Sequence, residues 1–316
     1  MGHGRWDNND WDSYTTKNTK GKSAREIFNS SAIHPDMDPR KIQLRESRNS
    51  ADNPHSTPII LALDVTGSMG VIAERMAREG LGTLVEQILD RKPVSDPHIM
   101  VMGVGDAYCD RAPLQASQFE ADIRIAEQLK NIYLEGGGGG NHFESYNLPW
   151  YFAAKKTEID SVSQGRKGVI FTFGDEECPP ELTKEHIKKL FGDDVPGNIS
   201  SKDLLKMVSA KYDVFHVVVE QGNHARSHKK EVYDSWNKVL PPERIVSLKD
   251  YNKLSEVLVS VLEVHNGKDP AAVVASWQGE TAKTVQDAIK NIKPAKAANS
   301  NAVPLPPSHL KLKLKP

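Results

Sequence analysis

An acid, two hydroxyls and two glycines follow the first strongly apolar segment of the chain. Residues 59–70 read IILALDVTGSMG, and Asp64, Thr66 and Ser68 alternate along the end of this stretch. An extended turn can aim three alternating side chains at one point, and Gly67 lets the backbone bend without a Cβ clash. Carboxylate and hydroxyl oxygens are hard ligands that suit Mg²⁺, Mn²⁺ or Ca²⁺. The spacing therefore predicts a metal site at the end of this segment.

Further oxygen-bearing residues follow other strand-like segments. PHIMVMGVGDAY ends close to Asp106, KGVIFTFGDEE ends close to Asp175, and the glycine run 136–140 precedes Asn141. The carboxyl ends of parallel strands meet at one edge of a sheet, so we expect these residues to converge there with Asp64. Because His and Cys are not clustered in the sequence, zinc and iron are disfavoured.

Strand-like and helix-like segments alternate from residue 57 onward. This alternation predicts an α/β fold with a doubly wound, mostly parallel sheet flanked by helices. Near-continuous apolar runs are typical of strands buried on both faces, and apolar residues at helical spacing mark the helices. The predicted strands begin at residues 57, 97, 167, 211 and 244, and the predicted helices are 72–89, 119–135, 147–159 and 253–264.

Composition divides the chain into three parts. Residues 1–56 are rich in Asn, Asp, Ser and Lys, and we predict an irregular arm that packs on the core, with KIQLRES as an edge strand. Residues 57–265 form the predicted domain. Residues 266–316 are predicted to be a flexible, disordered tail, although GETAKTVQDAIKNI within it fits a short helix.

The overall charge gives no sign of a polyanionic partner. Lys and Arg number 41 and Asp and Glu number 42 in 316 residues, so we expect no nucleic-acid or membrane partner. No apolar run approaches the roughly 18 residues of a membrane span, and the polar start lacks the apolar stretch of a signal peptide. Cys109 and Cys178 are too few for a disulfide framework. We therefore predict a cytoplasmic protein.

The motif LDVTGSM resembles the metal-ion-dependent adhesion site of von Willebrand factor A domains, and the resemblance covers residues 57–262. The first motif of that family reads Asp-x-Ser/Thr-Gly-Ser. The resemblance implies that Asp64 reaches the metal largely through water and that Thr66 and Ser68 bind it directly. It also implies that Asp175 is the later acid of the site. The chain is similar to the bacterial or phage cytosolic members of this family.

Three positions depart from the family motif. Gly174 and Glu176 flank the later acid where the family usually has Thr and Gly. The middle ligand, usually a Thr after two glycines, falls on Asn141, whose amide oxygen can still coordinate. Glu144 and Ser145 are the alternatives if the loop register shifts.

The resemblance implies a docking module and no enzymatic activity. Mg²⁺ takes six oxygens, and a site with few anionic ligands leaves one position that water fills. An Asp or Glu of a protein partner can take that position. Bacterial cytosolic members of the family often work beside AAA+ ATPases, so the resemblance implies such a partner.

Two other functions remain open. DVTGS also looks like the phosphorylation motif of haloacid-dehalogenase-type phosphotransferases or phosphatases, in which Asp64 would be the nucleophile. Those enzymes place a flap after this motif, whereas here a helix is expected from about Val71. The third possibility is a structural or assembly protein with the same fold.

Several polar residues near these motifs have simpler interpretations. We expect Asp106, Glu135, Glu176 and Glu177 to be solvated loop charges, with a more negative metal site as the alternative. The stretch NHARSHKK is expected to be a solvated loop, and His142 a surface histidine.

Overall fold

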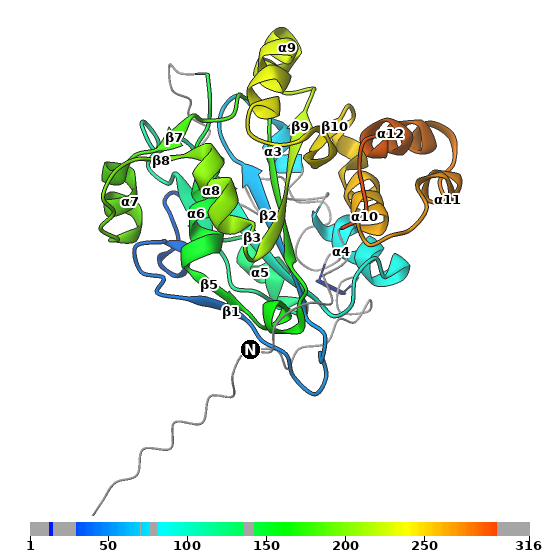
Figure 1. Cartoon of the computed structure of the whole chain (residues 1–316), viewed down its shortest axis with the longest axis horizontal. Helices are drawn as coiled ribbons and strands as arrows, with labels where there is room; N and C mark the ends of the chain where they lie inside the picture. The colour runs from blue at the N-terminus through cyan, green and yellow to red at the C-terminus, as the bar shows by residue number, and fades with distance from the viewer. Residues whose placement is uncertain (1–12, 15–29, 70, 76–80, 135–141, 296–316) are drawn as a thin grey trace, which may run out of the picture.

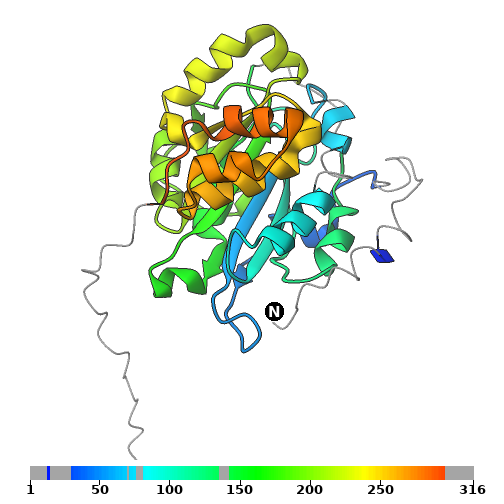
Figure 2. The same cartoon turned by 90° about the vertical axis from the view of Figure 1, so that its right-hand side faces the viewer.

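The structure is a computed structural model of the chain, and it describes residues 13–14, 30–69, 71–75, 81–134 and 142–295. A twisted six-stranded sheet forms the centre, and helices cover both of its faces (Figures 1 and 2). The strand order is β10-β9-β6-β2-β3-β4. Every pairing is parallel except that of β4 with β3. The predicted α/β, doubly wound, mostly parallel architecture is confirmed.

The central strands are those that the apolar runs predict. All eight residues of β2 are buried, because strands lie on both sides of it and helices on both faces. The edge strand β4 was not predicted, since its three residues carry too short a pattern. The strands are β2 (Thr57–Asp64), β3 (Pro97–Val104), β4 (Leu114–Ala116), β6 (Gly168–Gly174), β9 (Tyr212–Val219) and β10 (Ile245–Leu248).

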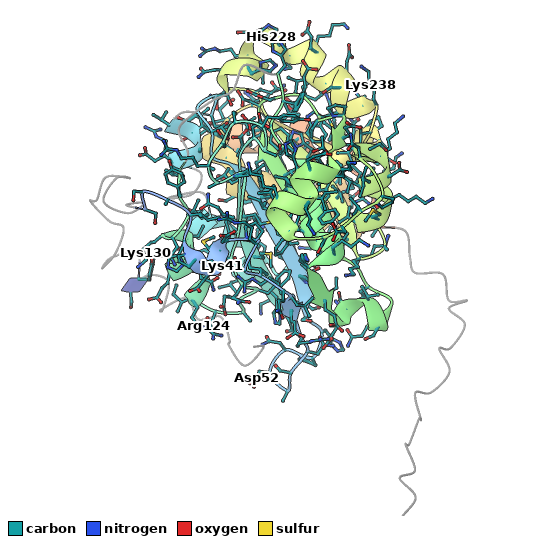
Figure 3. The ribbon with its side chains drawn as sticks, turned by 90° about the vertical axis from the view of Figure 1, so that its left-hand side faces the viewer. Lys41, Asp52, Arg124, Lys130, His228 and Lys238 are labelled. Carbon is teal, nitrogen blue, oxygen red and sulfur yellow. The ribbon has the colours of Figure 1, made fainter. Side chains whose placement is uncertain are left out.

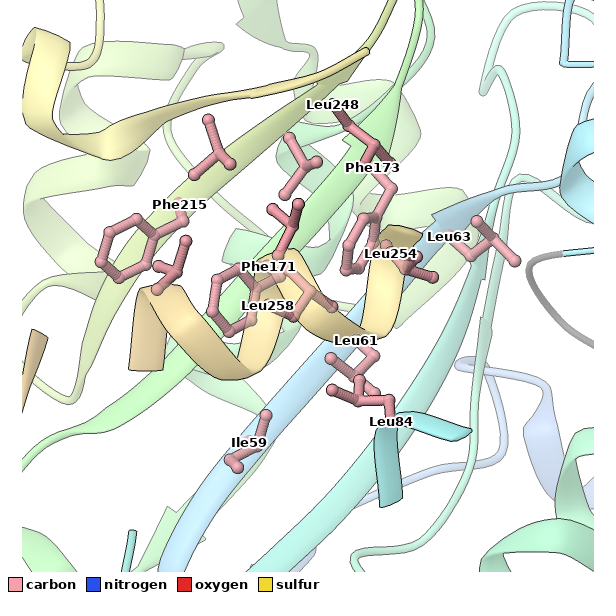
Figure 4. Packing of buried hydrophobic residues seen from close by; sticks show 14 of the residues in the cluster. Ile59, Leu61, Leu63, Leu84, Phe171, Phe173, Phe215, Leu248, Leu254 and Leu258 are labelled. Atoms are coloured by element: carbon pink, nitrogen blue, oxygen red, sulfur yellow. The ribbon is translucent and has the colours of Figure 1, made fainter. Parts of the chain in front are cut away.

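Alternate residues of each strand face two separate hydrophobic clusters. From β2, Ile59, Leu61 and Leu63 point to one cluster and Ile60 and Ala62 to the other, as a strand's two-residue period requires. Figure 4 shows the first cluster, in which these leucines meet phenylalanines of β6 and β9 and leucines of α10.

Each cluster is covered by its own set of helices. The first is covered by α3 (Val71–Arg75), α4 (Leu81–Arg91), α5 (Arg124–Leu129), α10 (Leu254–His265), α11 (Pro270–Ala275) and α12 (Gly279–Ile289). The second is covered by α6 (Asn147–Lys155), α7 (Lys184–Phe191), α8 (Ser201–Val208) and α9 (Asn223–Asn237).

Short elements connect this framework. They are the strands β1 (Arg45–Ser47), β5 (Thr157–Ile159), β7 (Glu181–Leu182) and β8 (Ile199–Ser200), and the single-turn 3₁₀ helices η1 (Pro35–Met37), η3 (Asp160–Gln164), η4 (Pro242–Arg244) and η5 (Tyr251–Lys253).

Three predicted helices differ in extent from the observed ones. The described part of segment 72–89 forms α3 and α4, and residues 76–80 lie outside the described ranges. Segment 119–135 contains only the short α5, because Glu120 pairs its backbone with Ile99 of β3. Segment 147–159 ends as a helix at Lys155, and its last three residues form β5.

The described part of the arm lies against the domain. Met37 and Ile42 are buried in the two hydrophobic clusters. The segment KIQLRES contains β1, which pairs in parallel with β5 as a separate two-stranded sheet and does not extend the main sheet.

The packed region extends past the boundary expected at residue 265. Helices α11 and α12 follow, and Val273, Val285 and Ile289 are buried in the first cluster. The tail prediction is therefore wrong for residues 270–292, because the sparse apolar residues there fall on one face that packs on α10. Residues 296–316 lie outside the described ranges. None of the described helices is long and apolar enough to cross a membrane.

Candidate metal centre at the strand ends

Asp64 is the last residue of β2 and has no exposed surface. Its Oδ1 accepts hydrogen bonds from the Thr66 amide at 2.9 Å and the Thr66 hydroxyl at 2.6 Å. Its Oδ2 accepts a 2.6 Å bond from the hydroxyl of Tyr146, which precedes α6. Both carboxylate oxygens of Asp64 are therefore held by protein donors.

Asp175, directly after β6, lies beside this loop and is also fully buried. The Ser68 hydroxyl donates to its Oδ1 at 2.8 Å, and the backbone amide of His224 donates to its Oδ2 at 2.8 Å. The hydroxyl oxygens of Thr66 and Ser68 lie 3.3 Å apart. The structure thus brings together Asp64, Thr66, Ser68 and Asp175, and Asn141 lies outside the described residues.

Two glycines permit this close packing. A Cβ on Gly174 would collide with the hydroxyl of Tyr146, and a Cβ on Gly222 would collide with the side chain of Asp175. This explains one departure from the family motif, since the Tyr146 hydroxyl fills the space that a side chain at position 174 would need. Sequence reasoning missed Tyr146, because it comes from a loop more than eighty residues after Asp64 and belongs to no motif.

Three more acids are buried around the same point. Asp106 is 1% exposed, Glu144 2% and Glu176 8%, so the expectation that Asp106 and Glu176 are solvated charges is wrong. Their loops fold back over the strand ends: the Ser145 hydroxyl donates to Asp106, and the Trp236 indole donates to the backbone carbonyl of Glu176. Glu177 is half-buried, and Glu135 lies outside the described residues.

Within the described ranges, four of the acids at the strand ends lack a cationic partner that would offset their burial. In the described part of the chain, none of Asp64, Glu144, Asp175 and Glu176 forms an ion pair with Lys, Arg or His. One oxygen each of Glu144 and Glu176 is buried without a hydrogen-bond partner. Such groups are costly unless a cation or a proton compensates them.

The pKa values of these acids reflect this environment. Burial and then the charge of Asp175 raise the pKa of Asp64. Burial and then the charges of Asp64 and Glu176 raise the pKa of Glu144. Burial, followed by the charges of Asp64 and Asp175, raises the pKa of Glu176 to about 8. The site is therefore short of positive charge.

The donor set fits a hard divalent cation. The predicted ligands that the structure describes are two carboxylates and two hydroxyls within one hydrogen-bonded chain. Among the described residues, no three His, Cys, Asp or Glu side chains are arranged to hold a metal by themselves. A metal held at this point would therefore need the hydroxyl oxygens as well as the carboxylates.

Three histidine rings lie close together, and one of them belongs to His224, whose backbone amide bonds Asp175. The rings of His224 and His228 are stacked with centroids 4.7 Å apart, and that of His142 lies 5.6 Å from His224. The stretch NHARSHKK, expected to be a loop, forms the first turns of α9, because its apolar Ala225 packs into the core. Figure 3 shows His228 on this helix at the periphery of the molecule.

Comparison with known proteins gives only distant likenesses. No protein-family model matches the chain, and no curated protein matches its sequence. A pilus adhesin, SpaC from Lactobacillus rhamnosus GG, is similar in structure with a TM-score of 0.48 at 10% identity, over 70% of this chain and 32% of the adhesin. A von Willebrand factor type A protein from Catenulispora acidiphila has a TM-score of 0.37 at 12% identity, over 68% of this chain and 43% of that protein. This chain thus matches less than half the length of either.

Proposed function

We propose that the chain is a protein-interaction module that depends on a divalent cation of the Mg²⁺ type. Asp64, Thr66, Ser68 and Asp175 would hold the cation, and Asn141 would complete the set. When bound, the cation supplies a positive centre to which a partner's Asp or Glu side chain can attach. An AAA+ ATPase remains the partner class that the sequence resemblance implies.

The observation that carries this proposal is the group of buried acids around the Asp64 loop. Asp64, Glu144, Asp175 and Glu176 have no cationic partner in the part of the chain that the structure describes. Burying several carboxylates near one another is unfavourable in a low-dielectric interior, and a bound divalent ion offsets that cost. Because Thr66 and Tyr146 already occupy the oxygens of Asp64, the residue suits an outer role in which it orients the direct ligands.

The surface around the centre supports binding of a protein. Four large hydrophobic side chains are exposed among the described residues. Two of them are Val71 at 65%, the first residue of α3 after β2, and Tyr108 at 57%, in the turn after β3. Tyr108 contacts Phe143 and His186 edge-on, so an aromatic surface borders the acids. Exposed apolar groups beside a polar site are typical of interaction surfaces.

The geometry disfavours the phosphotransferase alternative. A nucleophilic Asp must present an oxygen to the incoming phosphate, whereas both oxygens of Asp64 are hydrogen-bonded and the residue is fully buried. A helix also begins at Val71, where such enzymes have a flap. Mg²⁺-dependent hydrolysis of an aryl phosphate that disappears in Asp64→Asn would support the enzyme instead.

The proposal is tested by calorimetric titration of the metal-free protein with Mg²⁺ and Mn²⁺. Ser68→Ala should weaken binding about tenfold or more, because it removes a direct ligand. Ser163→Ala is the matched control, since Ser163 is an exposed serine on η3, before β6, away from the acids. Equal affinities for the two variants would leave the site without support.

A further inference from the structure

An open groove of about 600 Å³ lies directly beside the candidate metal centre. Its walls are the loop and helix α3 that follow β2, the loop between β9 and α9, and Tyr251 of η5. Ser68 belongs to both the metal centre and the groove, and its carbonyl accepts a bond from the Asn223 amide at 3.2 Å. The groove is thus continuous with the centre. Helices α3 and α9, which contribute to its lining, lie at the same end of the sheet in Figure 1.

Part of the groove is apolar and exposed. Val71 and Ile72 of α3 line it together with Tyr251. Val71 is the most exposed of the large hydrophobic side chains among the described residues, although Ile72 beside it is buried. An apolar side chain of a bound molecule would therefore gain contact area here without displacing any part of the domain.

The rim of the groove carries unneutralised positive charge. Arg226 lines it, and Arg75 donates to the Tyr251 hydroxyl at 3.2 Å. Neither arginine forms an ion pair with an acid among the described residues. The groove's own acid, Glu220, is already bound by Lys229 at 2.6 Å and by hydroxyls of Tyr233 and Ser247.

We infer that this groove binds the residues adjacent to the partner's metal-binding acid, and that the partner segment is an extended peptide of acidic and apolar residues. One carboxylate would reach the metal centre, an apolar side chain would cover Val71 and Ile72, and a second carboxylate would pair with Arg226 or Arg75. This inference rests on the proposed function, because the first carboxylate needs the cation.

Selection from a library of random displayed peptides tests the inference. The full chain is immobilised with Mg²⁺, and bound peptides are eluted with EDTA. We expect enriched peptides to carry an acid with an apolar residue and a second acid within a few positions. Enriched peptides with a lone acid and no such neighbours would overturn the groove inference and leave the proposed function intact. Peptides that stay bound in EDTA would overturn both.

Charge-reversal variants then locate the binding site of an enriched, synthesised peptide by fluorescence anisotropy. Arg226→Glu should weaken binding about fivefold, because a favourable ion pair becomes a repulsion. Lys238→Glu, at the other end of α9, is the matched control and should leave affinity unchanged (Figure 3). Val71→Ser should weaken binding about threefold through lost apolar contact.

Two further measurements separate the groove from the metal centre. When the peptide's second acid is changed to its amide, Arg226→Glu and the unmodified chain should bind the peptide with equal affinity. Calorimetry should show that Arg226→Glu binds Mg²⁺ as the unmodified chain does. Equal peptide affinity for Arg226→Glu and Lys238→Glu would overturn the inference.

Discussion

Two regions of this molecule give their acidic side chains very different surroundings. At the start of β9, Asp213 contacts Arg244 at 3.1 Å and His265 at 3.1 Å. In α10, Glu263 contacts Arg91 at 2.7 Å and Lys268 at 2.6 Å. At the opposite ends of the strands, Asp64, Glu144, Asp175 and Glu176 have no such partners among the described residues.

The pKa shifts follow this difference. Burial alone would raise the pKa of Asp213, but the bond from His265 and the charge of Arg244 lower it below its usual value. Burial and mutual repulsion raise the pKa values of Asp64 and Glu144. Among the described residues, the chain therefore supplies cations to Asp213 and Glu263 and none to Asp64 and Glu144, where we propose that an external cation binds.

Glu263→Gln should be the most destabilising of the variants that probe this comparison. It removes the charge of a buried carboxylate and leaves the partly exposed Arg91 without its carboxylate partner. We expect the free energy of unfolding to fall by about 2–3 kcal/mol. Urea unfolding monitored by circular dichroism measures this, and a loss below about 0.5 kcal/mol would contradict the contrast between the regions.

Tyr146→Phe should have the next largest effect. It removes the hydroxyl that donates to Asp64 Oδ2 and accepts the Glu176 amide at 3.4 Å. We expect a loss of about 1–2 kcal/mol in stability and weaker Mg²⁺ binding, because Asp64 loses one of the donors that orient it. Tyr212→Phe is the control: this buried tyrosine bonds Thr157, so it should lower stability without changing Mg²⁺ affinity.

Glu144→Gln should act in the opposite direction to Glu263→Gln, although the chemical change is the same. Since Glu144 is buried among other acids, its raised pKa favours the neutral carboxyl when no cation is bound, and an amide in its place removes no ion pair and no favourable charge. In EDTA we expect stability to be unchanged or to rise by up to about 1 kcal/mol. A loss as large as that of Glu263→Gln would show that Glu144 has an unrecognised cationic partner.

The contribution of the paired acid Asp213 should appear when the free energy of unfolding is measured at decreasing pH. The pKa of Asp213 is lower in the folded protein than in the unfolded chain. Its contribution to stability is therefore fully present above the unfolded-state pKa of 3.8 and is lost as the pH falls through the folded-state pKa. Asp213→Asn should therefore be less stable than the unmodified chain at neutral pH, by about 1 kcal/mol or less after solvent screening. The two should converge once the pH falls below the lowered folded-state pKa of Asp213. A difference that persists at the lowest pH would indicate lost packing and no charge effect.

The sequence predicts the elements whose patterns arise from burial alone. Strands β2, β3, β6, β9 and β10 are recognisable because both faces are covered, which makes their apolar runs almost continuous. Helices α7, α8 and α9 were not predicted, because each buries only a narrow stripe amid charged residues. In α9, Ala225, Val232 and Trp236 are the buried residues among fifteen.

The candidate centre was predictable only where its residues belong to a local sequence pattern. Asp64, Thr66, Ser68 and Asp175 belong to local motifs at strand ends, so their convergence follows from parallel pairing. Tyr146 and Glu144 join the site because the loop before α6 folds over the strand ends, and no local pattern encodes that path. The places of Tyr146 and Glu144 in the site are set by tertiary contacts of that loop.

The most direct test of the central claim is a thermal unfolding measurement of the full chain in EDTA and in increasing Mg²⁺. A cation that binds only the folded protein raises stability by RT ln(1 + [L]/Kd), or about 2.7 kcal/mol at a hundredfold excess over Kd. We predict a Tm that rises with Mg²⁺ for the unmodified chain and for Ser163→Ala, and a Tm that does not respond for the double variant Thr66→Ala, Ser68→Ala. An identical Mg²⁺ response in the double variant, or no response in the unmodified chain, would contradict the account.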